Sequence, residues 1–322
     1  PACPPPRRRP APPPGRAATC AAAAPAPTSL DDQSIERCLH WIGTTFGWQS
    51  EAEAFRIVGC MNATAVRDIT GPSLRDRISD EEWKVRVDLA AAYRLAHLYG
   101  WTTTLVYNHI SARIPGPDHH FLLNPFGLRW DEVTASNLVK IDLEGNILDD
   151  TPHKINNAGY TIHSAIHQAR DDAMCVIHTH TEAGMALSAL EDGLMYTNQD
   201  AMMFYGHTAY HDFEGIALDL SERERLVQDL GDNKVMILRN HGLLTTGNIV
   251  ADAWVQMYFL EKVCSAQLSL LSAAAASGQK IRFPSKEVCE HTSKQYDEAG
   301  TGEREWPALI RQLNDVTTEY MD

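Results

Sequence analysis

Two short apolar segments, each running directly into histidine, constrain the fold of this chain more than any other feature. Met174 to Ile177 has the composition of a buried strand and leads into His178-Thr-His180. Lys234 to Asn240 has the pattern of a second buried strand and leads into the turn-prone pair His241-Gly242. Side chains two apart on a strand project from one face, so the first two histidines point the same way. The pattern predicts a sheet whose strand ends carry three histidines able to share one metal ion.

A histidine pair on an apolar strand has a second interpretation. Both rings can be core side chains that bond to backbone carbonyl groups. Against this, three neutral imidazoles with a vacant fourth position are typical of catalytic zinc sites. The same ligands suit Fe(II), Co(II) or Mn(II), so we expect one divalent ion per subunit, with zinc the first choice.

Charge and cysteine usage limit the partners and the compartment. The chain has 28 basic and 42 acidic residues, and a formal net charge of −14. Such acidity argues against a nucleic-acid partner. No run approaches the roughly 18 apolar residues of a membrane helix, so we expect a soluble protein without a membrane partner. The 7 cysteines are scattered without a Cys-x-x-Cys pair, which is typical of reduced thiols in the cytoplasm.

Composition divides the chain into four parts. Residues 1–29 are rich in Pro, Ala and Arg, with almost nothing to bury, and are expected to be disordered. They fit an organelle transit peptide and translated upstream sequence equally well. Residues 30–78 form an N-terminal extension, 79–278 the main domain, and 279–322 a helical C-terminal extension that we expect to pack on a neighbouring surface or a second subunit.

Helical and strand-like patterns alternate along the main domain. Ser79-Asp-Glu-Glu82 has the spacing of a capping box and opens the first helix, which Gly100 ends. Further helices are expected at 156–170, 182–190, 221–230 and 250–276. Besides the two strands that carry histidine, strands are expected at 104–114, 120–123, 138–143 and 207–213. The alternation predicts an α/β sheet covered by helices.

Five motifs give the chain a resemblance to the class II aldolase/adducin family of metal-dependent sugar-phosphate aldolases and epimerases, which includes the head domain of adducin. They are Tyr107–Arg113, Asn157–His163, His178–His180, Ala209–Gly215 and Leu238–Leu243. The resemblance implies a central antiparallel (mixed) β-sheet flanked by helices in three layers. It also implies a homotetramer with sites at subunit boundaries, and metal binding by His178, His180 and His241.

The family's chemistry explains why a metal is needed. In its aldolases a divalent cation stabilises an enediolate, which lowers the barrier to breaking the adjacent carbon–carbon bond. By resemblance, the leading hypothesis is a metal-dependent lyase that acts by retro-aldol cleavage or decarboxylation on a small hydroxy- or keto-acid or a related carbonyl compound.

The chain departs from the aldolases at the catalytic and phosphate-binding positions. Their catalytic Glu is matched by Gly159, which cannot move a proton. Their phosphate-binding hydroxyl residues are matched by Asn157 and Ala158, and the second phosphate turn, Asn124–Gly127, retains only the glycine. A small acidic substrate fits these positions better than a sugar phosphate. The residues expected to contact it are Asn108, Ser111, Arg113, Gly127 and Asn157.

Several residues have both a plain role and a functional one. Asn108 could satisfy only backbone groups in a turn. Candidates for the missing acid or base are Glu182, Tyr210 with its neighbour His211, and His163. Their plain alternatives are a first-turn helix carboxylate for Glu182, ordinary strand residues for Tyr210 and His211, and a residue that orients a metal ligand for His163.

Two other functions compete with the lyase. The motifs Asn157–Gly159 and Ala209–Gly215 are closer to the adducin branch, which favours a non-catalytic head domain with a role in assembly or actin binding. A three-histidine Fe(II) centre could also activate O₂, as in an oxygenase.

Overall fold

The computed structural model describes residues 73–215 and 221–322, and all structural statements concern those ranges. The expected disordered leader, 1–29, and the extension as far as residue 72 lie outside them. Within the described residues, seven strands form one sheet in the order β3-β2-β1-β4-β7-β6-β5. All neighbours are antiparallel except β5 and β6, which are parallel. The expected mixed, mainly antiparallel sheet is therefore confirmed. The strands are β1 (His109–Arg113), β2 (Phe121–Leu123), β3 (Val139–Ile141), β4 (Cys175–Thr179), β5 (Thr208–His211), β6 (Val235–Leu238) and β7 (Gly242–Gly247).

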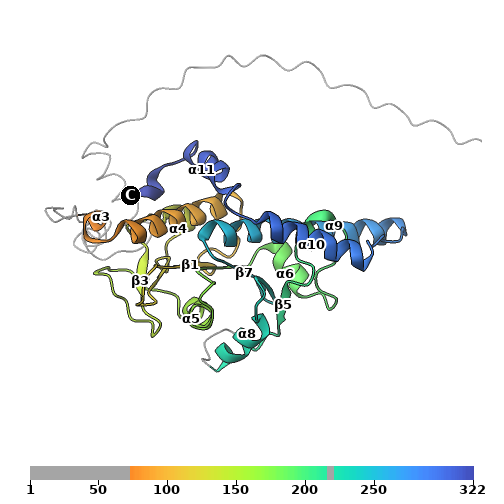
Figure 1. The fold of residues 1–322 in the computed structure, drawn as a ribbon, viewed down its shortest axis with the longest axis horizontal. Coiled ribbons are helices and arrows are strands. Elements are labelled where there is room, and N and C mark those ends of the chain that lie inside the picture. The colour runs from red at the N-terminus through yellow and green to blue at the C-terminus, as the bar shows by residue number, and fades with distance from the viewer. Residues whose placement is uncertain (1–72, 216–220) are drawn as a thin grey trace, which may run out of the picture. The chain divides into compact units, whose positions relative to one another are not determined.

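Helices cover both faces of this sheet, as the three-layer expectation required. On one face, α4 (Asp80–Leu98) contacts β1, while α9 (Val250–Ser277) contacts β4 and β7. On the other face, α5 (Asn157–Ala169) contacts β1 and α8 (Glu222–Leu230) contacts β5. Figure 1 shows α4 and α5 on opposite sides of β1. A short helix, α6 (Glu182–Ser188), follows β4 and packs on α9.

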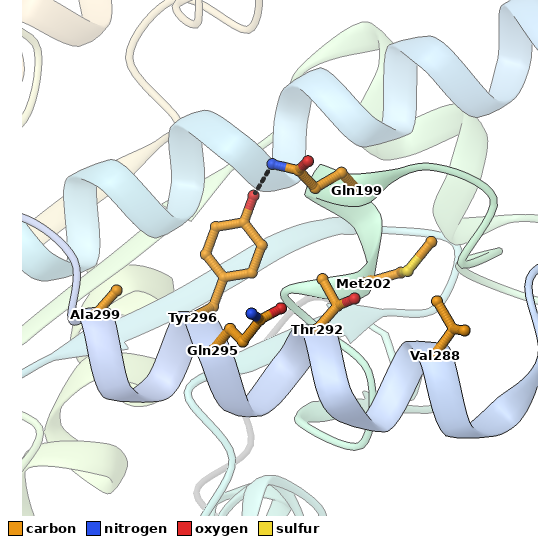
Figure 2. Close-up of a pocket in the computed structure, with 7 residues that line it drawn as sticks. All are labelled: Gln199, Met202, Val288, Thr292, Gln295, Tyr296 and Ala299. Carbon is orange, nitrogen blue, oxygen red and sulfur yellow. Dashed lines mark hydrogen bonds between the residues drawn. The ribbon is translucent and has the colours of Figure 1, made fainter.

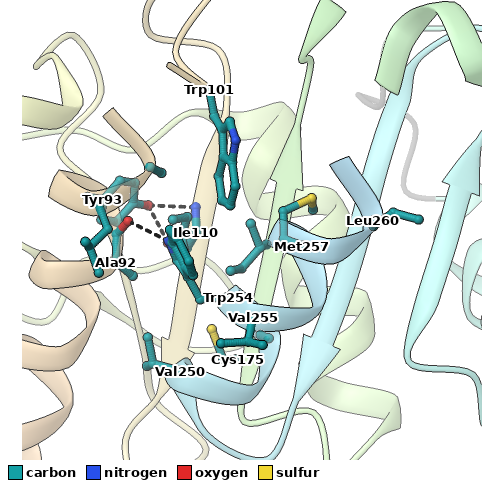
Figure 3. Packing of buried hydrophobic residues seen from close by; sticks show 14 of the residues in the cluster. Ala92, Tyr93, Trp101, Ile110, Cys175, Val250, Trp254, Val255, Met257 and Leu260 are labelled. Atoms are coloured by element: carbon teal, nitrogen blue, oxygen red, sulfur yellow. Dashed lines mark hydrogen bonds between the residues drawn. The ribbon is translucent and has the colours of Figure 1, made fainter. Parts of the chain in front are cut away.

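Side chains of each central strand alternate between two hydrophobic cores. On β4, Cys175 and Ile177 join the core under α4 and α9, whereas Val176 joins the core under α5 and α8. This alternation is the two-residue period of a strand covered on both faces. The larger core centres on Trp254, whose ring stacks on Trp101 at 4.9 Å between centroids. Figure 3 shows the two rings between the helices and the sheet.

Two polar side chains inside the larger core bond to the backbone. The indole nitrogen of Trp254 donates to the Ala92 carbonyl oxygen at 3.2 Å. The hydroxyl of Tyr93 accepts from the Ile110 amide at 2.7 Å. Burial raises the pKa of Tyr93, so the ring stays neutral. These bonds, drawn in Figure 3, join α9 to α4 and α4 to β1.

The helices start where their capping residues predict. Ser79 accepts from the Glu82 amide at 3.1 Å and starts α4. Asn156 accepts from the Ala158 amide at 3.0 Å and starts α5. A side-chain acceptor at these positions satisfies an amide that has no partner within the helix.

The C-terminal extension packs on its own domain. Helix α10 (Lys286–Ala299) contacts α7 (Gln199–Met202), and α11 (Trp306–Asn314) contacts α4. The last turn, η2 (Glu319–Met321), also contacts α4. Of the two expected alternatives, the contacts match packing on a neighbouring surface, here that of the same domain. Two short elements complete the described fold, α3 (Leu74–Arg77) and η1 (Trp130–Glu132). No helix in the described ranges is both long and apolar enough to span a bilayer.

Candidate metal centre

Strand pairing brings the three predicted histidines together. His178 is on β4 and His180 directly follows this strand, while His241 lies in the turn from β6 to β7. Strand β7 pairs with β4 as well as with β6. The turn that precedes β7 therefore lies beside the C-terminal end of β4. One ligand atom from each ring lies within 4.8 Å of the others, and the ring centroids are 4.6 to 4.7 Å apart. The geometry is that of three ligands of one ion.

Burial keeps these rings in the neutral form that binds metals. It lowers the pKa of His178 well below the usual value, with help from His241 and His180. Burial also lowers the pKa of His180, and that of His241 falls to about 4. Rings with such pKa values are unprotonated at neutral pH, so a metal need not displace protons from them.

Backbone groups orient the ligands. Nδ1 of His178 is 3.0 Å from the Leu243 carbonyl oxygen, to which it donates, so Nε2 carries the lone pair that a metal could bind. This Nε2 lies 2.7 Å from Nε2 of His180. The side-chain oxygen of Asn108 accepts from the His180 amide at 2.7 Å, and the Thr103 hydroxyl donates to the His180 carbonyl oxygen at 3.0 Å. The Asn108 side chain therefore bonds to backbone groups, which is the plain alternative to substrate binding considered from the sequence. Three neutral imidazoles, of which His178 is oriented by a backbone carbonyl, fit a divalent cation of the zinc type.

Ser111 and Arg113 are not brought to this centre. On β1, His109 is opposite His178, whereas Ser111 is opposite Val176, further from the histidine end. The buried Ser111 hydroxyl bonds to His163 Nδ1 at 2.6 Å and to His167 Nε2 at 2.7 Å. Arg113 pairs with Asp171 at 3.3 Å and donates to the His167 carbonyl oxygen. The side chains of both residues thus hold α5 on the sheet, and neither is turned to a reactant at the three histidines.

None of the acid or base candidates forms a hydrogen bond with one of the three histidines in the described residues. Glu182 is exposed in the first turn of α6 and lines a cavity of about 330 Å³ that contains none of the three histidines. Tyr210 lies on β5, where its hydroxyl accepts from the Leu194 amide at 3.0 Å. Its neighbour His211 is bound by Asp229 at 2.7 Å and Glu222 at 3.4 Å. His163 bonds to Ser111 and not to any of the three clustered histidines. Their catalytic roles remain predictions.

Gly127 and Asn157 lie on neighbouring surface segments. Gly127 is exposed in a turn with φ 99, and the preceding amide, of Phe126, donates to the Lys154 carbonyl oxygen at 2.8 Å. Asn157 is the exposed first residue of α5. The structure thus brings the turn and the start of α5 together, and a role for them in binding substrate remains a prediction.

His109 is the site residue that sequence reasoning missed. It is 4% exposed, and its ring lies 6.3 Å from that of His178 and 5.9 Å from that of His163. Burial lowers its pKa to about 3. The residue lies inside the motif Tyr107–Arg113, but its place opposite His178 depends on the pairing of β1 with β4, which no local pattern reveals.

Another cavity lies away from the three histidines. Figure 2 shows one of about 470 Å³ between α7 and α10, where Gln199 donates to the Tyr296 hydroxyl at 3.2 Å. It is lined by Gln199, Met202, Val288, Thr292, Gln295, Tyr296 and Ala299. None of these is a histidine or a predicted site residue, so this cavity is separate from the metal centre.

Comparison with known proteins agrees with the fold. The family model for the class II aldolase and adducin N-terminal domain matches residues 87–268. An aldolase II superfamily protein from Pseudomonas syringae is similar in structure, with 55% identity and a TM-score of 0.73 over 78% of this chain and 100% of that chain. L-fuculose 1-phosphate aldolase from Glaciozyma antarctica PI12 has 30% identity and a TM-score of 0.64, over 74% of this chain and 92% of that chain.

The adducin branch is similar as well. Alpha-adducin from Rattus norvegicus is 39% identical over 268 residues, which are 79% of this chain and 36% of that protein. The motifs, the sheet and the match to the family model all agree. This chain belongs to the class II aldolase/adducin family.

Proposed function

We propose that this protein is a metal-dependent lyase of the aldolase type. It breaks a carbon–carbon bond in a small hydroxy- or keto-acid by retro-aldol cleavage or decarboxylation. The observation that carries the proposal is the convergence of His178, His180 and His241 with ligand atoms within 4.8 Å. Family membership supports the reaction class, and the departures at Gly159 and Asn157 support an acid rather than a sugar phosphate.

The chain's own residues prepare the centre before a reactant arrives. The Leu243 carbonyl holds the ring of His178, and Asn108 with Thr103 holds the backbone of His180. Ligands fixed in advance lose little freedom when charge develops nearby. A divalent cation bound there supplies positive charge for the negative oxygen that forms as the bond breaks. We propose zinc as that cation, and a homotetramer as the assembly.

Metal content tests the proposal first. Protein purified without chelator should contain about one divalent ion per subunit, and His178→Ala less than about a tenth of an ion, because one of three ligands is lost. Elemental analysis measures both. His97→Ala, which changes an exposed histidine on α4, is the control and should keep its metal.

Activity tests the proposal second. Metal-loaded protein is assayed against a panel of hydroxy-acids, keto-acids and sugar phosphates, with His178→Ala as the blank. Turnover of an acid by the wild type alone is expected. Equal rates for wild type and blank on every compound would refute the lyase. Light scattering measures the assembly state of the same samples.

An adducin-like role in assembly is the second candidate. It is favoured by Gly159, which cannot supply an acid or base, and by the likeness to alpha-adducin. Wild-type protein with less than about a tenth of an ion per subunit would favour assembly over catalysis. Uptake of O₂ by protein loaded anaerobically with Fe(II) would instead point to an oxygenase.

A further inference from the structure

Gly159 and His109 fit each other across the interface between α5 and β1. A Cβ atom at position 159 would lie 2.6 Å from Cδ2, 2.7 Å from Cγ and 2.8 Å from Nε2 of the His109 ring. Real Cβ atoms do not approach other atoms so closely, so even alanine would push the imidazole away. Gly159 has no positive φ that would require glycine for the backbone. Its role is therefore to make room for His109.

The ring that fills this space has no hydrogen-bond partner. Both Nδ1 and Nε2 of His109 are buried, and neither bonds to any described residue. Most buried histidines of this domain are satisfied: His167, for example, bonds to Ser111 and to the Ala173 carbonyl oxygen. A buried nitrogen without a partner is destabilising, and a phenyl ring would fill the same space without that penalty. An imidazole here is best explained by a ligand that it binds.

The position of His109 identifies where that ligand lies. His109 is the direct cross-strand partner of His178, and their rings are inclined by only 19°. Its centroid is 6.3 Å from that of His178, whereas rings within the metal centre are 4.6 to 4.7 Å apart. Among the described residues, His109 thus does not belong to the group His178, His180 and His241, but it lies next to this group. A two-carbon hydroxy-acid is long enough to contact both.

We propose that His109 binds the reactant. A ring nitrogen of His109 forms a hydrogen bond with a hydroxyl or carboxylate oxygen of a small 2-hydroxy-acid held at His178, His180 and His241, and Gly159 is the space that admits this ring. The inference rests on the proposed function and adds a residue that determines which reactants fit. His109 contacts the reactant, and it is not a fourth ligand of the metal.

Cobalt spectroscopy of the whole protein tests this without an activity assay. The wild type, His109→Phe and Gly159→Ala are loaded with Co(II) and titrated with glycolate, and the visible absorption of the cobalt reports both binding steps. His109→Phe fills the same space without a nitrogen, so its Co(II) affinity should stay within about threefold of wild type. Its glycolate affinity should fall about tenfold, the usual effect of one lost hydrogen bond. Gly159→Ala should weaken glycolate similarly, since it displaces the ring.

His167→Gln is the matched control. It also changes a buried histidine on the α5 face, but one whose nitrogens are both bonded within the protein. It should lose stability while keeping the wild-type affinities for Co(II) and glycolate. Thermal unfolding of each variant verifies that it is folded.

The outcomes separate the two proposals. Wild-type glycolate affinity in both His109→Phe and Gly159→Ala would overturn this inference and leave the proposed function intact. Loss of Co(II) from His109→Phe would make His109 a metal ligand and also overturn it. Wild-type protein that binds no Co(II), or whose cobalt spectrum does not respond to glycolate, would overturn the proposed function and this inference with it.

Discussion

His167 shows how single buried side chains tie the pH dependence of this protein to its fold. Its ring is fully buried between α5 and the sheet, with both nitrogens bonded, and burial lowers its pKa from 6.5 to about 3. The unfolded chain therefore binds one more proton than the folded chain between these pH values. Under linkage, the free energy of unfolding falls as pH falls through this window. Above about pH 6.5, His167 is neutral in both states and does not make the free energy of unfolding depend on pH.

Replacing His167 by glutamine should remove the contribution of this residue to the pH dependence of the free energy of unfolding. Glutamine retains hydrogen-bonding groups but does not titrate. Between pH 6 and 5, His167→Gln should lose about 1.4 kcal/mol less free energy of unfolding than the wild type, the value for one proton per pH unit. Urea unfolding at pH 7, 6 and 5 provides the comparison. Parallel losses in the two proteins would mean that His167 is already protonated in the folded state.

Among the elements, β7 connects the fold to the metal centre. It pairs with β4 on one side and β6 on the other, so it brings His241 to the end of β4. Both its ends are glycines with no room for a side chain. A Cβ at Gly242 would overlap the Thr179 carbonyl oxygen and lie 3.2 Å from Cδ2 of His180, and one at Gly247 would lie 2.5 Å from the Ala253 amide nitrogen.

Alanine at these two glycines should separate stability from metal binding. Gly242→Ala and Gly247→Ala should each lower the free energy of unfolding by about 1–3 kcal/mol, as overpacking does. Only Gly242→Ala should also weaken metal binding, by about tenfold or more, because its methyl group displaces His180. Chemical unfolding and competition with a chromogenic chelator measure the two effects. Equal metal affinities in the two variants would show that β7 does not position the ligands.

At the scale of the whole molecule, the C-terminal segment packs on the domain away from His178, His180 and His241. Tyr320 is 1% exposed, and its carbonyl oxygen accepts from the Ala135 amide at 2.9 Å. Its hydroxyl donates to the Asn314 side chain at 2.8 Å. The segment thus closes over α4, on the face of the sheet opposite α5.

Replacing Tyr320 should destabilise the domain but leave the three-histidine site unchanged. Tyr320→Ala should lower the free energy of unfolding by about 3–5 kcal/mol, the range for removing a large buried aromatic ring. Its metal content should equal that of the wild type. Met321→Ala, which changes a neighbour that is 37% exposed, is the control and should have a much smaller effect. A variant that unfolds like the wild type would show that the segment is not anchored through Tyr320.

Local patterns were enough for most of the helices. Ser79 caps α4 as the sequence predicts, because a cap depends on residues only three apart in the chain. Asn156, which the expected helix 156–170 included, is instead the residue that caps α5. The strands were placed less well. The expected strand 104–114 narrows to His109–Arg113, since Leu105 has a φ of 62 that ends any extended run. The expected strands do not include β7, whose two end glycines resemble turn residues in the sequence.

The sequence by itself identified the family and the three histidines that the structure brings together. His178 and His180 share a face because the period of a strand is local, and the five motifs are linear patterns. Only the tertiary structure decided that Ser111 and Arg113 support α5, that Asn108 holds the backbone of His180, and that His109 lies opposite His178 against Gly159. The reason is physical. Which strand pairs with which, and in what register, depends on burial over the whole sheet, and a one-residue shift would turn every side chain to the other face.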